Sequence, residues 1–494
     1  MIDPWKNLSK LSRVQVRDLQ NRLLHSFLNR QVYPFSSFYR NLFDQKRIDP
    51  RKIKTVEDLK HIPLTSKRDF LDSGKNADRF RDFILQPDPK TIKKYLPAHK
   101  LASMALRSVL QGKQFVKDEV SKEYRPVFIT FTTGTTERPL PYVYTKHDIN
   151  NLSISGSRMV SLFGIQESEH IVNLFPYAPH LAFWQVVFGG LSSGILILST
   201  GGGKVSGTEA SIAALLKMKP AVVLGVPSYL YHILRAAKEK GCDLSFIKKV
   251  VLGASRIPDT FKTRVTELLC SLGSKDPFIF GTYGFTEART AWAECPAPAG
   301  VSSGYHLYPD KEIFEVIDPQ TGEIKREGED GELVYTSIDS RGSAVIRYRT
   351  GDFVKGGITY EPCPFCRRTV PRISSNITRM SDVRSLKLSK IKGTLVDLNS
   401  FSEILEKFEQ IPEWQIEIRK KDNDPFEIDE VIVYVCVKDG VDKGQIEEAI
   451  KKNIVLATEI TPNAVFFISF DEMVRRLELE TSSKEKRIID VRPK

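Results

Sequence analysis

The sequence predicts an α/β protein. A large N-terminal domain has parallel-rich sheets, helices and a β subdomain, and a small C-terminal α+β domain follows it. Between residues 125 and 260, short apolar runs alternate with longer amphipathic stretches, which indicates βα units and a largely parallel sheet. Residues 311–360 have the pattern of strands joined by polar turns, and after about residue 375 the pattern changes again. At 494 residues the chain is long enough for two or more domains.

The first 95 residues predict a helical arm. The segment SKLSRVQVRDLQNRLLHSFLNRQ places apolar residues at intervals of three to five, which is a helical spacing. In the next part, strands are predicted at HIVNLFPY, GILILST, AVVLGVPS and KKVVLGAS. The amphipathic stretches SIAALLKMK and YLYHILRAAKEKG predict helices between them.

The remaining elements belong to the β subdomain and the C-terminal domain. Strands of the β subdomain are predicted at KEIFEVIDPQTGEI, GELVYTSI and AVIRYRTGDFV. Further on, EWQIEIRK and VIVYVCVK alternate apolar and polar residues around a charged turn, which predicts a hairpin. QIEEAIKKNI predicts a helix and NAVFFISF a last strand. We therefore divide the chain into an N-terminal domain, residues 1–378, and a C-terminal domain, residues 379–494.

Composition and charge exclude several classes of protein. The formal net charge is +12, but the basic residues are spread along the chain and interleaved with acids, so we expect no nucleic-acid partner. No run approaches the roughly 18 apolar residues of a membrane span, and the amphipathic start of the chain lacks the apolar core of a secretion signal. We expect a cytoplasmic enzyme with no membrane partner. Of six cysteines only Cys363 and Cys366 lie close in sequence, which favours metal binding or burial over disulfides.

The stretch FITFTTGTTERPLPYVYT, residues 128–145, is rich in threonine around Gly134 and follows an apolar strand. Glycine tolerates positive φ, so consecutive backbone N–H groups can point to one side, and each threonine hydroxyl adds a donor. This combination suits a polyphosphate. It is not the G-x-x-x-x-G-K-[ST] loop of kinases and GTPases. The alternative is a threonine-rich strand edge with a turn.

Two later motifs favour the phosphate-binding interpretation over the strand edge. GTYGFTEA (281–288) follows the short strand PFIF, and RYRTGDF (347–353) ends another. In this order, the three motifs resemble those of the adenylate-forming superfamily of acyl-CoA synthetases. The segments IKTVEDLKHIPLTSKRDF, VVLGVPSYL and ETSSKEKRIIDVR resemble the phenylacetate–CoA ligase branch of that superfamily, over nearly the whole length of the chain.

The resemblance implies an AMP-forming carboxylate–CoA ligase. Such an enzyme uses ATP and Mg²⁺ to convert a carboxylic acid into an acyl-adenylate, and then transfers the acyl group to coenzyme A, releasing AMP and pyrophosphate. The family rotates its small C-terminal domain between the two steps, so we expect that domain to be mobile. The oligomeric state is left open, with a homodimer among the arrangements considered.

The resemblance also assigns roles to individual residues. Those expected at the nucleotide are Thr132, Thr133, Gly134, Thr135 and Thr136 around the phosphates, Gly253, Ala254, Ser255, Tyr283 and Gly284 at the adenine, and Asp352 at the ribose. Those expected to be catalytic are Thr286 at the α-phosphate, Glu287 as the Mg²⁺ ligand, Arg379 at the nucleotide, and Lys484 between the carboxylate and the α-phosphate. Without the resemblance, the sequence SSKEKR around Lys484 is typical of a solvated tail.

The chain departs from the family pattern at several positions. Glu137 stands where the threonine loop usually carries glycine, Ser381 replaces the usual hinge acid, and Ser483 replaces the glycine before the lysine. The segment from Asp382 to Gly393 is also longer than in relatives. These departures bear on domain alternation and transfer to coenzyme A more than on adenylation.

Two further groups of residues are candidates for binding. The segment EPCPFCRR gives C-x-x-C, and Cys295 and His306 could join Cys363 and Cys366 in a structural Zn²⁺ site, as the resemblance to zinc-containing relatives implies. The alternative is a pair of reduced surface cysteines and an unrelated buried Cys295. The candidates for the acyl substrate, against an equal expectation of core packing, are Phe175, Tyr177, His180 and Trp184. Their aromatic character favours an aryl or bulky acyl acid.

Three functions are therefore carried forward. The first is the carboxylate–CoA ligase. The second is an adenylating enzyme whose acceptor is a protein thiol, an amine or a cofactor hydroxyl. The third is a zinc-containing binding protein on a catalytically decayed scaffold.

Overall fold

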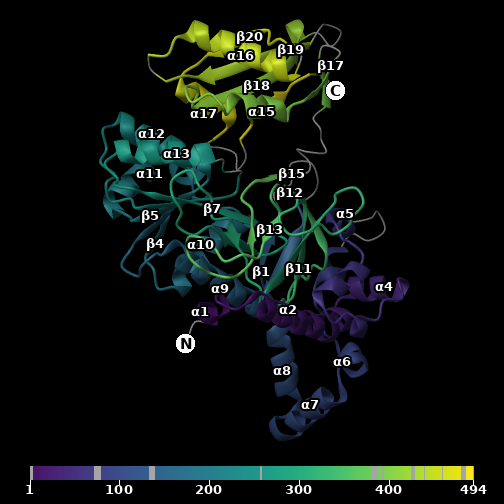
Figure 1. Cartoon of the computed structure of the whole chain (residues 1–494). Coiled ribbons are helices and arrows are strands. Elements are labelled where there is room, and N and C mark those ends of the chain that lie inside the picture. Colours follow the sequence, from purple (N-terminus) through teal and green to yellow (C-terminus); the bar gives the residue numbers. More distant parts are fainter. Residues whose placement is uncertain are drawn as a thin grey trace.

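The computed structural model describes residues 4–71, 79–132, 139–255, 257, 259–379, 388–391, 394–423, 429–438, 440–458, 460–479 and 485–492. Two hydrophobic cores dominate the molecule. The larger core contains buried side chains from Trp5 to Ile373, and a second one lies between Leu398 and Val465. Figure 1 shows the C-terminal part stacked on one end of the main body and a helical projection leaving the other end.

Helices form the N-terminal part of the chain. They are α1 (Pro4–Leu8), α2 (Arg13–Phe27), α3 (Tyr33–Phe35), α4 (Ser37–Gln45), α5 (Lys67–Phe70), α6 (Pro89–Tyr95), α7 (Ala98–Gln111) and α8 (Lys113–Tyr124), with a π-helical turn at Leu28–Val32 and short 3-10 turns at Pro50–Lys52, Val56–His61 and Arg79–Phe83. The start of α2 is set by a capping box, in which Ser12 accepts from the backbone of Gln15 and Gln15 accepts in return. The helical part thus continues beyond the predicted limit at residue 95, to Tyr124.

A nine-stranded sheet forms the centre of the body. Its strands, in spatial order, are β13 (Ile358–Thr359), β14 (Arg372–Ile373), β9 (Tyr305–His306), β8 (Thr290–Ala293), β7 (Phe278–Phe285), β6 (Lys249–Leu252), β5 (Val222–Gly225), β3 (Ile171–Asn173) and β4 (Ile197–Ser199). From β7 to β4 all pairs are parallel, and from β7 to β13 all are antiparallel. β7 joins the two halves, because its first residues pair with β6 and its last residues pair with β8.

The order of the parallel strands decides which face each helix covers. The connection from β3 to β4 runs through α10 (Leu181–Ser192), in the opposite direction to the connections through α11 (Gly203–Met218), α12 (Pro227–Glu239) and α13 (Asp259–Ser271). Because such crossovers are right-handed, α10 lies on one face and the other three helices lie on the opposite face. Figure 1 shows this arrangement, with α9 (Lys146–Phe163) beside α10. Gly156 of α9 and Gly189 of α10 meet so closely that a Cβ on either would collide with the other backbone.

Two smaller sheets complete the body. β1 (Pro126–Phe131) and β2 (Pro141–Thr145) form an antiparallel hairpin. The β subdomain is an antiparallel sheet in the order β10 (Glu312–Ile317), β11 (Gly331–Ser337), β12 (Tyr348–Val354) and β15 (Ile377–Arg379).

The C-terminal part contains a four-stranded sheet with helices and a separate two-stranded sheet. In spatial order the first is β20 (Ala464–Phe467), β19 (Asp429–Cys436), β18 (Glu413–Lys420) and β21 (Ile488–Asp490), and the second is β16 (Leu388–Ile391) and β17 (Thr394–Asp397). The helices are α15 (Asn399–Leu405), α16 (Lys443–Thr458) and α17 (Phe470–Leu477), with a 3-10 turn at Lys421–Asn423. The predicted hairpin is present, because β18 pairs antiparallel with β19 from Glu413↔Cys436 to Lys420↔Asp429.

The C-terminal part lies next to α12 and α13 (Figure 1). Arg264 of α13 donates to the carbonyl oxygens of Phe408 and Pro412, at 3.0 and 3.3 Å. Phe470 stacks on His232 of α12 with 5.9 Å between ring centroids, and the Arg235 guanidinium lies 4.1 Å from the Phe470 ring. The predicted α/β fold class is confirmed. The domain boundary after residue 378 stays a prediction.

Candidate active site

The side chains of Tyr283 and Arg379 both contact the carboxylate of Asp352. The Tyr283 hydroxyl donates to Oδ2 of Asp352 at 2.7 Å, and Nη1 of Arg379 lies 3.2 Å from Oδ1. Asp352 stands opposite Arg379 in the register of β12 and β15, so the pairing of the strands itself places the two charges together. The nearby Asp352 carboxylate raises the pKa of Arg379, and burial raises the pKa of Tyr283. The centre of the site is therefore a buried carboxylate with acceptor capacity left for a further hydroxyl.

Glu287 lies beside this group. Its Oε1 accepts a hydrogen bond from the Tyr348 hydroxyl at 2.8 Å, and its negative charge also acts on Arg379. Within the described part of the chain, Oε2 of Glu287 has no hydrogen-bond partner. Carboxylate oxygens are the ligands that Mg²⁺ prefers, so the surroundings of Glu287 fit a magnesium ligand.

The end of β1 reaches the same place. The Thr286 hydroxyl is 3.5 Å from the carbonyl oxygen of Phe131, and Nδ1 of His180 is 3.0 Å from that oxygen. Thr132 and Leu140 pair through the Thr132 N–H and the Leu140 carbonyl, and the Leu140 N–H donates to the Thr132 hydroxyl, each at 3.0 Å. The residues that flank the threonine loop in sequence, Thr132 and Leu140, therefore pair with each other directly after Phe131, which contacts Thr286.

Several predicted residues lie outside the described ones. These are Thr133, Gly134, Thr135, Thr136, Glu137, Ser381, Ser483 and Lys484. Their predicted roles stay predictions.

The predicted adenine segment follows β6 at the carboxyl end of the parallel sheet, where open α/β sheets bind ligands. Ala254 has φ 68°, a left-handed conformation that is uncommon for a residue with a side chain. The hydroxyl oxygen of Ser255 is buried and has no partner among the described residues. An unpaired buried hydroxyl is costly, so Ser255 fits a ligand that would supply the missing hydrogen bond.

The predicted acyl residues lie along one side of this cluster. Phe175 is buried, and its ring lies against Gly253. Trp184 packs edge-on against Phe128 and Tyr177, with 5.1 and 6.0 Å between ring centroids. Tyr177 itself is largely exposed. The structure thus brings Phe175 and His180 to the site, while Tyr177 stands at its outer edge.

Sequence reasoning missed two members of the site. Tyr348 is the first residue of the Y-R-T-G-D motif, and its contact with Glu287 could not be derived from spacing. Arg289, two residues after Glu287, is buried and pairs with Asp148 at 3.0 Å. The available signal was the capping pattern Thr145-x-x-Asp148, which marks Thr145 as the N-cap of α9 and Asp148 as its capping-box partner in the first turn.

The four predicted zinc ligands form a compact cluster. The ligand atoms of Cys295, His306, Cys363 and Cys366 all lie within 4.8 Å of one another. The sulfurs of Cys295 and Cys363 are 3.6 Å apart, and Cys366 Sγ is 3.2 Å from His306 Nε2. Tetrahedral ligands at Zn–S distances of about 2.3 Å are separated by about 3.8 Å, so the cluster has nearly the size that Zn²⁺ requires. His306 Nδ1 is 3.2 Å from the carbonyl oxygen of Ala293, which can only accept, so Nε2 keeps its lone pair for a metal.

Comparison with known proteins agrees with this geometry. Residues 51–340 match the model of the family described as AMP-binding enzyme. The chain is 26% identical to phenylacetate-coenzyme A ligase from Thermus thermophilus, over 84% of this chain and 80% of that protein. It is 24% identical to the phenylacetate-coenzyme A ligase of Aromatoleum evansii, over 99% of this chain and 97% of that protein.

Solved structures of 2-hydroxyisobutyryl-CoA ligase share the fold. The postadenylation state, in complex with R3-HIB-AMP, gives a TM-score of 0.73 at 18% identity, over 99% of this chain and 92% of that one. The complex with 2-HIB-AMP and CoA in the thioesterification state gives 0.62 at 18% identity, over 98% of this chain and 91% of that one. The resemblance inferred from the motifs is confirmed. The chain belongs to the AMP-binding enzyme family, on the branch of the phenylacetate–CoA ligases.

Proposed function

We propose that the protein is an AMP-forming carboxylate–CoA ligase: it activates a carboxylic acid with ATP and transfers the acyl group to coenzyme A. The observation that carries this proposal is the meeting of Tyr283, Asp352 and Arg379 beside Glu287, because it joins two family motifs and the arginine at the domain junction in one place. The family match and the relatives that are phenylacetate–CoA ligases support the same activity.

In the first step, a carboxylate oxygen of the acid attacks the α-phosphorus of ATP. The bond from that phosphorus to the oxygen bridging to the β-phosphate breaks, and pyrophosphate leaves with the electron pair. Both reactants are anions, so the site has to supply positive charge and hydrogen-bond donors where they meet. Lys484 is the predicted source of that charge, with Thr286 and the threonine loop as hydroxyl donors to the phosphates.

Asp352 and Tyr283 hold the nucleoside in this proposal. The Asp352 carboxylate accepts from the ribose hydroxyls, and the bonds from Tyr283 and Arg379 fix its orientation before the nucleotide arrives. Glu287 would hold Mg²⁺, which neutralises phosphate charge when bound. Tyr348 orients Glu287 through its hydroxyl.

In the second step, the thiol sulfur of coenzyme A attacks the acyl carbon. The bond between that carbon and the phosphate oxygen breaks, AMP leaves with the oxygen, and the thiol proton passes to solvent. The proposed substrate is an acid with an aryl or bulky apolar group, because Phe175 lies against Gly253 and Trp184, which packs on Phe128, follows His180 by one turn of α10.

The cysteine and histidine cluster binds one structural Zn²⁺ in this account. Cys295 follows β8 by two residues, His306 ends β9, and Cys363 and Cys366 lie in the segment between β13 and β14. A closed set of four ligands leaves no position for a substrate, so the role is to hold these strands together. β8 pairs directly with Tyr283 and Gly284 of β7, and the cluster therefore supports the wall of the nucleotide site.

The test is acid-dependent ATP–pyrophosphate exchange across aryl and alkyl carboxylates, followed by a search for the thioester after addition of coenzyme A. We expect exchange with at least one acid and an acyl-CoA product. Exchange without a thioester would point to another acceptor, and no exchange with any acid would contradict the enzymatic proposal.

A lysine variant tests the assignment at the C-terminus. Lys484→Ala is expected to abolish exchange while ATP binding is kept, with Lys486→Ala as the control two residues away. Lys486 pairs with Glu478 on the surface and has no role in the proposal. A fully active Lys484→Ala protein would overturn the role of this lysine.

A further inference from the structure

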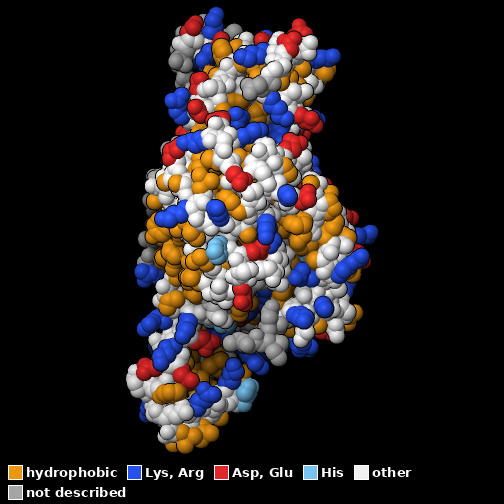
Figure 2. Space-filling view, turned by 90° about the vertical axis from the view of Figure 1, so that its left-hand side faces the viewer, with side chains coloured by type: hydrophobic (Ala, Val, Ile, Leu, Met, Phe, Trp, Pro, Cys, Tyr) orange, Lys and Arg blue, Asp and Glu red, His pale blue; other side chains and the backbone are white. Residues whose placement is uncertain are grey.

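A basic helical hairpin projects from the body. It consists of α7 and α8, and neither helix has a buried side chain. Figure 1 shows the hairpin, with α6 at its side, at the end of the molecule opposite to the C-terminal part. No other element of the described chain covers its far end in Figure 1 or Figure 2.

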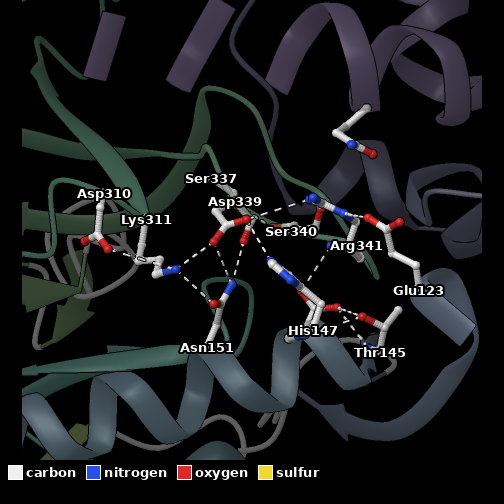
Figure 3. A network of polar contacts seen from close by, with 12 residues as sticks. Glu123, Thr145, His147, Asn151, Asp310, Lys311, Ser337, Asp339, Ser340 and Arg341 are labelled. Atoms are coloured by element: carbon white, nitrogen blue, oxygen red, sulfur yellow. Dashed lines mark hydrogen bonds and ion pairs between the residues drawn. The ribbon is translucent and has the colours of Figure 1, made fainter. Parts of the chain in front are cut away.

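The base of the hairpin is firmly attached. The Tyr124 hydroxyl donates to Gln31 at 2.5 Å, and the Tyr124 ring meets Phe35 edge-on with 5.5 Å between centroids. Arg341 bonds Glu123 of α8 and also lies 3.7 Å from Asp339. Figure 3 shows Arg341 between these two carboxylates, in a network that connects the hairpin to the start of α9. These contacts fix the base of the hairpin to the body, so the rest of the hairpin projects outward.

The far end of the hairpin is apolar and exposed. Val109 and Leu110 are 83% and 73% exposed, and Leu106 and Phe115 are exposed as well. Leu106, Val109 and Leu110 follow the i, i+3, i+4 spacing of one helix face. Gly112, at φ +91°, reverses the chain after α7 and brings Phe115, in the first turn of α8, back toward the same end. Figure 2 shows hydrophobic side chains at the end of this lobe and Lys and Arg side chains along its flanks.

The hairpin and the helix beside it are positively charged. Residues 98–124, which form α7 and α8, contain five Lys or Arg and three Asp or Glu, a net charge of +2, and Lys90, Lys93 and Lys94 of α6 raise the net charge of residues 89–124 to +5. A second copy docked tip to tip would bring two such charges together, and that repulsion disfavours self-association through this surface. An anionic surface is attracted instead.

We propose that the α7–α8 tip docks the protein onto an anionic lipid surface. Val109, Leu110 and Phe115 would enter the boundary between headgroups and acyl chains, while Lys113 and Lys117 contact lipid phosphates. Among the described residues no helix is long and apolar enough to cross a membrane. The proposed docking is peripheral, and it departs from the expectation of no membrane partner.

The test is co-sedimentation of the full chain with large vesicles, either pure phosphatidylcholine or phosphatidylcholine mixed with phosphatidylglycerol. We expect binding to the mixed vesicles at least tenfold stronger than to the neutral ones, and a loss of that preference at about 0.5 M salt, where charges are screened. The double variant Val109→Asp/Leu110→Asp should lose at least tenfold in binding. Lys113→Glu/Lys117→Glu should do the same.

The matched control is Leu456→Asp. Leu456 is also 73% exposed on a helix, but in the C-terminal part. All variants should keep the melting temperature and the ATP–pyrophosphate exchange rate, which separates lost docking from lost folding. Equal binding to both vesicle types, or wild-type binding by both double variants, would overturn the proposal. So would a concentration-dependent dimer that the tip variants abolish without any vesicle binding.

Discussion

At the scale of single residues, the account depends on a carboxylate that is oriented before its ligand arrives. Asp352 is buried, accepts a hydrogen bond from Tyr283 and forms an ion pair with Arg379. A charged acceptor held in this way binds a hydroxyl more strongly than a solvated one, because no reorganisation is required. Its contribution should appear in ATP binding.

The first prediction therefore concerns Asp352→Asn. The substitution keeps the shape but removes the charge, and hydrogen bonds to charged groups contribute about 1.5–3 kcal/mol. We expect the KM for ATP to rise by about 10- to 100-fold with a smaller change in the KM for the acid. Steady-state kinetics of the exchange reaction measures both constants. Equal increases in the two, or no increase for ATP, would contradict the ribose assignment.

Glu312 gives a second prediction at this scale. It is buried, its Oε1 accepts from Trp292 Nε1 and the Tyr308 N–H, and burial raises its pKa to about 8. The folded protein thus binds a proton that the unfolded chain has released, so the stability contributed by Glu312 is full below about pH 4.5 and is lost as the pH rises to about 8. Glu312→Gln should be close to wild type in free energy of unfolding at pH 4.

At pH 9 the same variant should be more stable than wild type, because it has no proton to lose. Urea unfolding at both pH values measures the difference, with the exposed Glu448→Gln as the control. A constant difference between the variant and the wild type across this range would show that Glu312 does not titrate as described.

The residue types at the site were predictable, while their partners were only partly so. The motifs supplied Tyr283, Glu287 and Asp352 by resemblance. The bond from Tyr348 to Glu287 depends on how β12 lies against the end of β7, and no spacing in the sequence encodes that distance.

At the scale of elements, strands were predictable from apolar runs, but their pairing was not. β12 and β15 meet with Asp352 opposite Arg379, although a polar segment of about twenty residues with its own short strands separates them. The helices α7 and α8 were missed as continuations of the arm. Leu106, Val109 and Leu110 of α7 do have the i, i+3, i+4 spacing that predicts a helix, so the signal for α7 was present in the sequence.

Asp148 connects several elements to the catalytic motif. It accepts from the Thr145 and Gly342 backbones at 2.9 and 2.7 Å and pairs with Arg289, which follows Thr286 and Glu287. Asp148→Asn would leave the buried Arg289 charge unpaired, at a cost of about 3–5 kcal/mol in stability. We also expect a fall in kcat, because the turn that carries Glu287 loses its support.

The matched control for this third prediction is Asp310→Asn. Asp310 pairs with another buried arginine, Arg158, at 2.8 Å but makes no contact with the motif. Both variants should lower the urea midpoint, and only Asp148→Asn should lower the kcat of the folded enzyme. A similar fall in kcat for both would assign Asp148 a purely structural role.

At the scale of the whole molecule, Zn²⁺ bound by Cys295, His306, Cys363 and Cys366 would hold the antiparallel half of the central sheet together. The fourth prediction is that the protein binds one zinc ion per chain, which elemental analysis measures. Cys363→Ser should lose the metal and lower the Tm by at least about 5 °C, the shift for a few kcal/mol in a large domain. Cys270→Ser, at an exposed cysteine outside the cluster, should change neither. Metal-free protein with an unchanged Tm would contradict the zinc assignment.

The overall division into a large α/β part and a smaller C-terminal part was predictable, because each has its own apolar pattern and its own core. The contact between them was not. Among the described residues it includes Phe470 against Tyr231, His232 and Arg235, together with Arg264, and these residues carried no motif.

The central claim is that an oxygen of the acid attacks the α-phosphorus of ATP. The most direct measurement uses the acid identified by exchange, labelled with ¹⁸O in its carboxylate, and mass spectrometry of the products after coenzyme A is added. The account predicts one ¹⁸O atom in each AMP released and none in pyrophosphate. Label in inorganic phosphate together with ADP, or AMP without label, would contradict it.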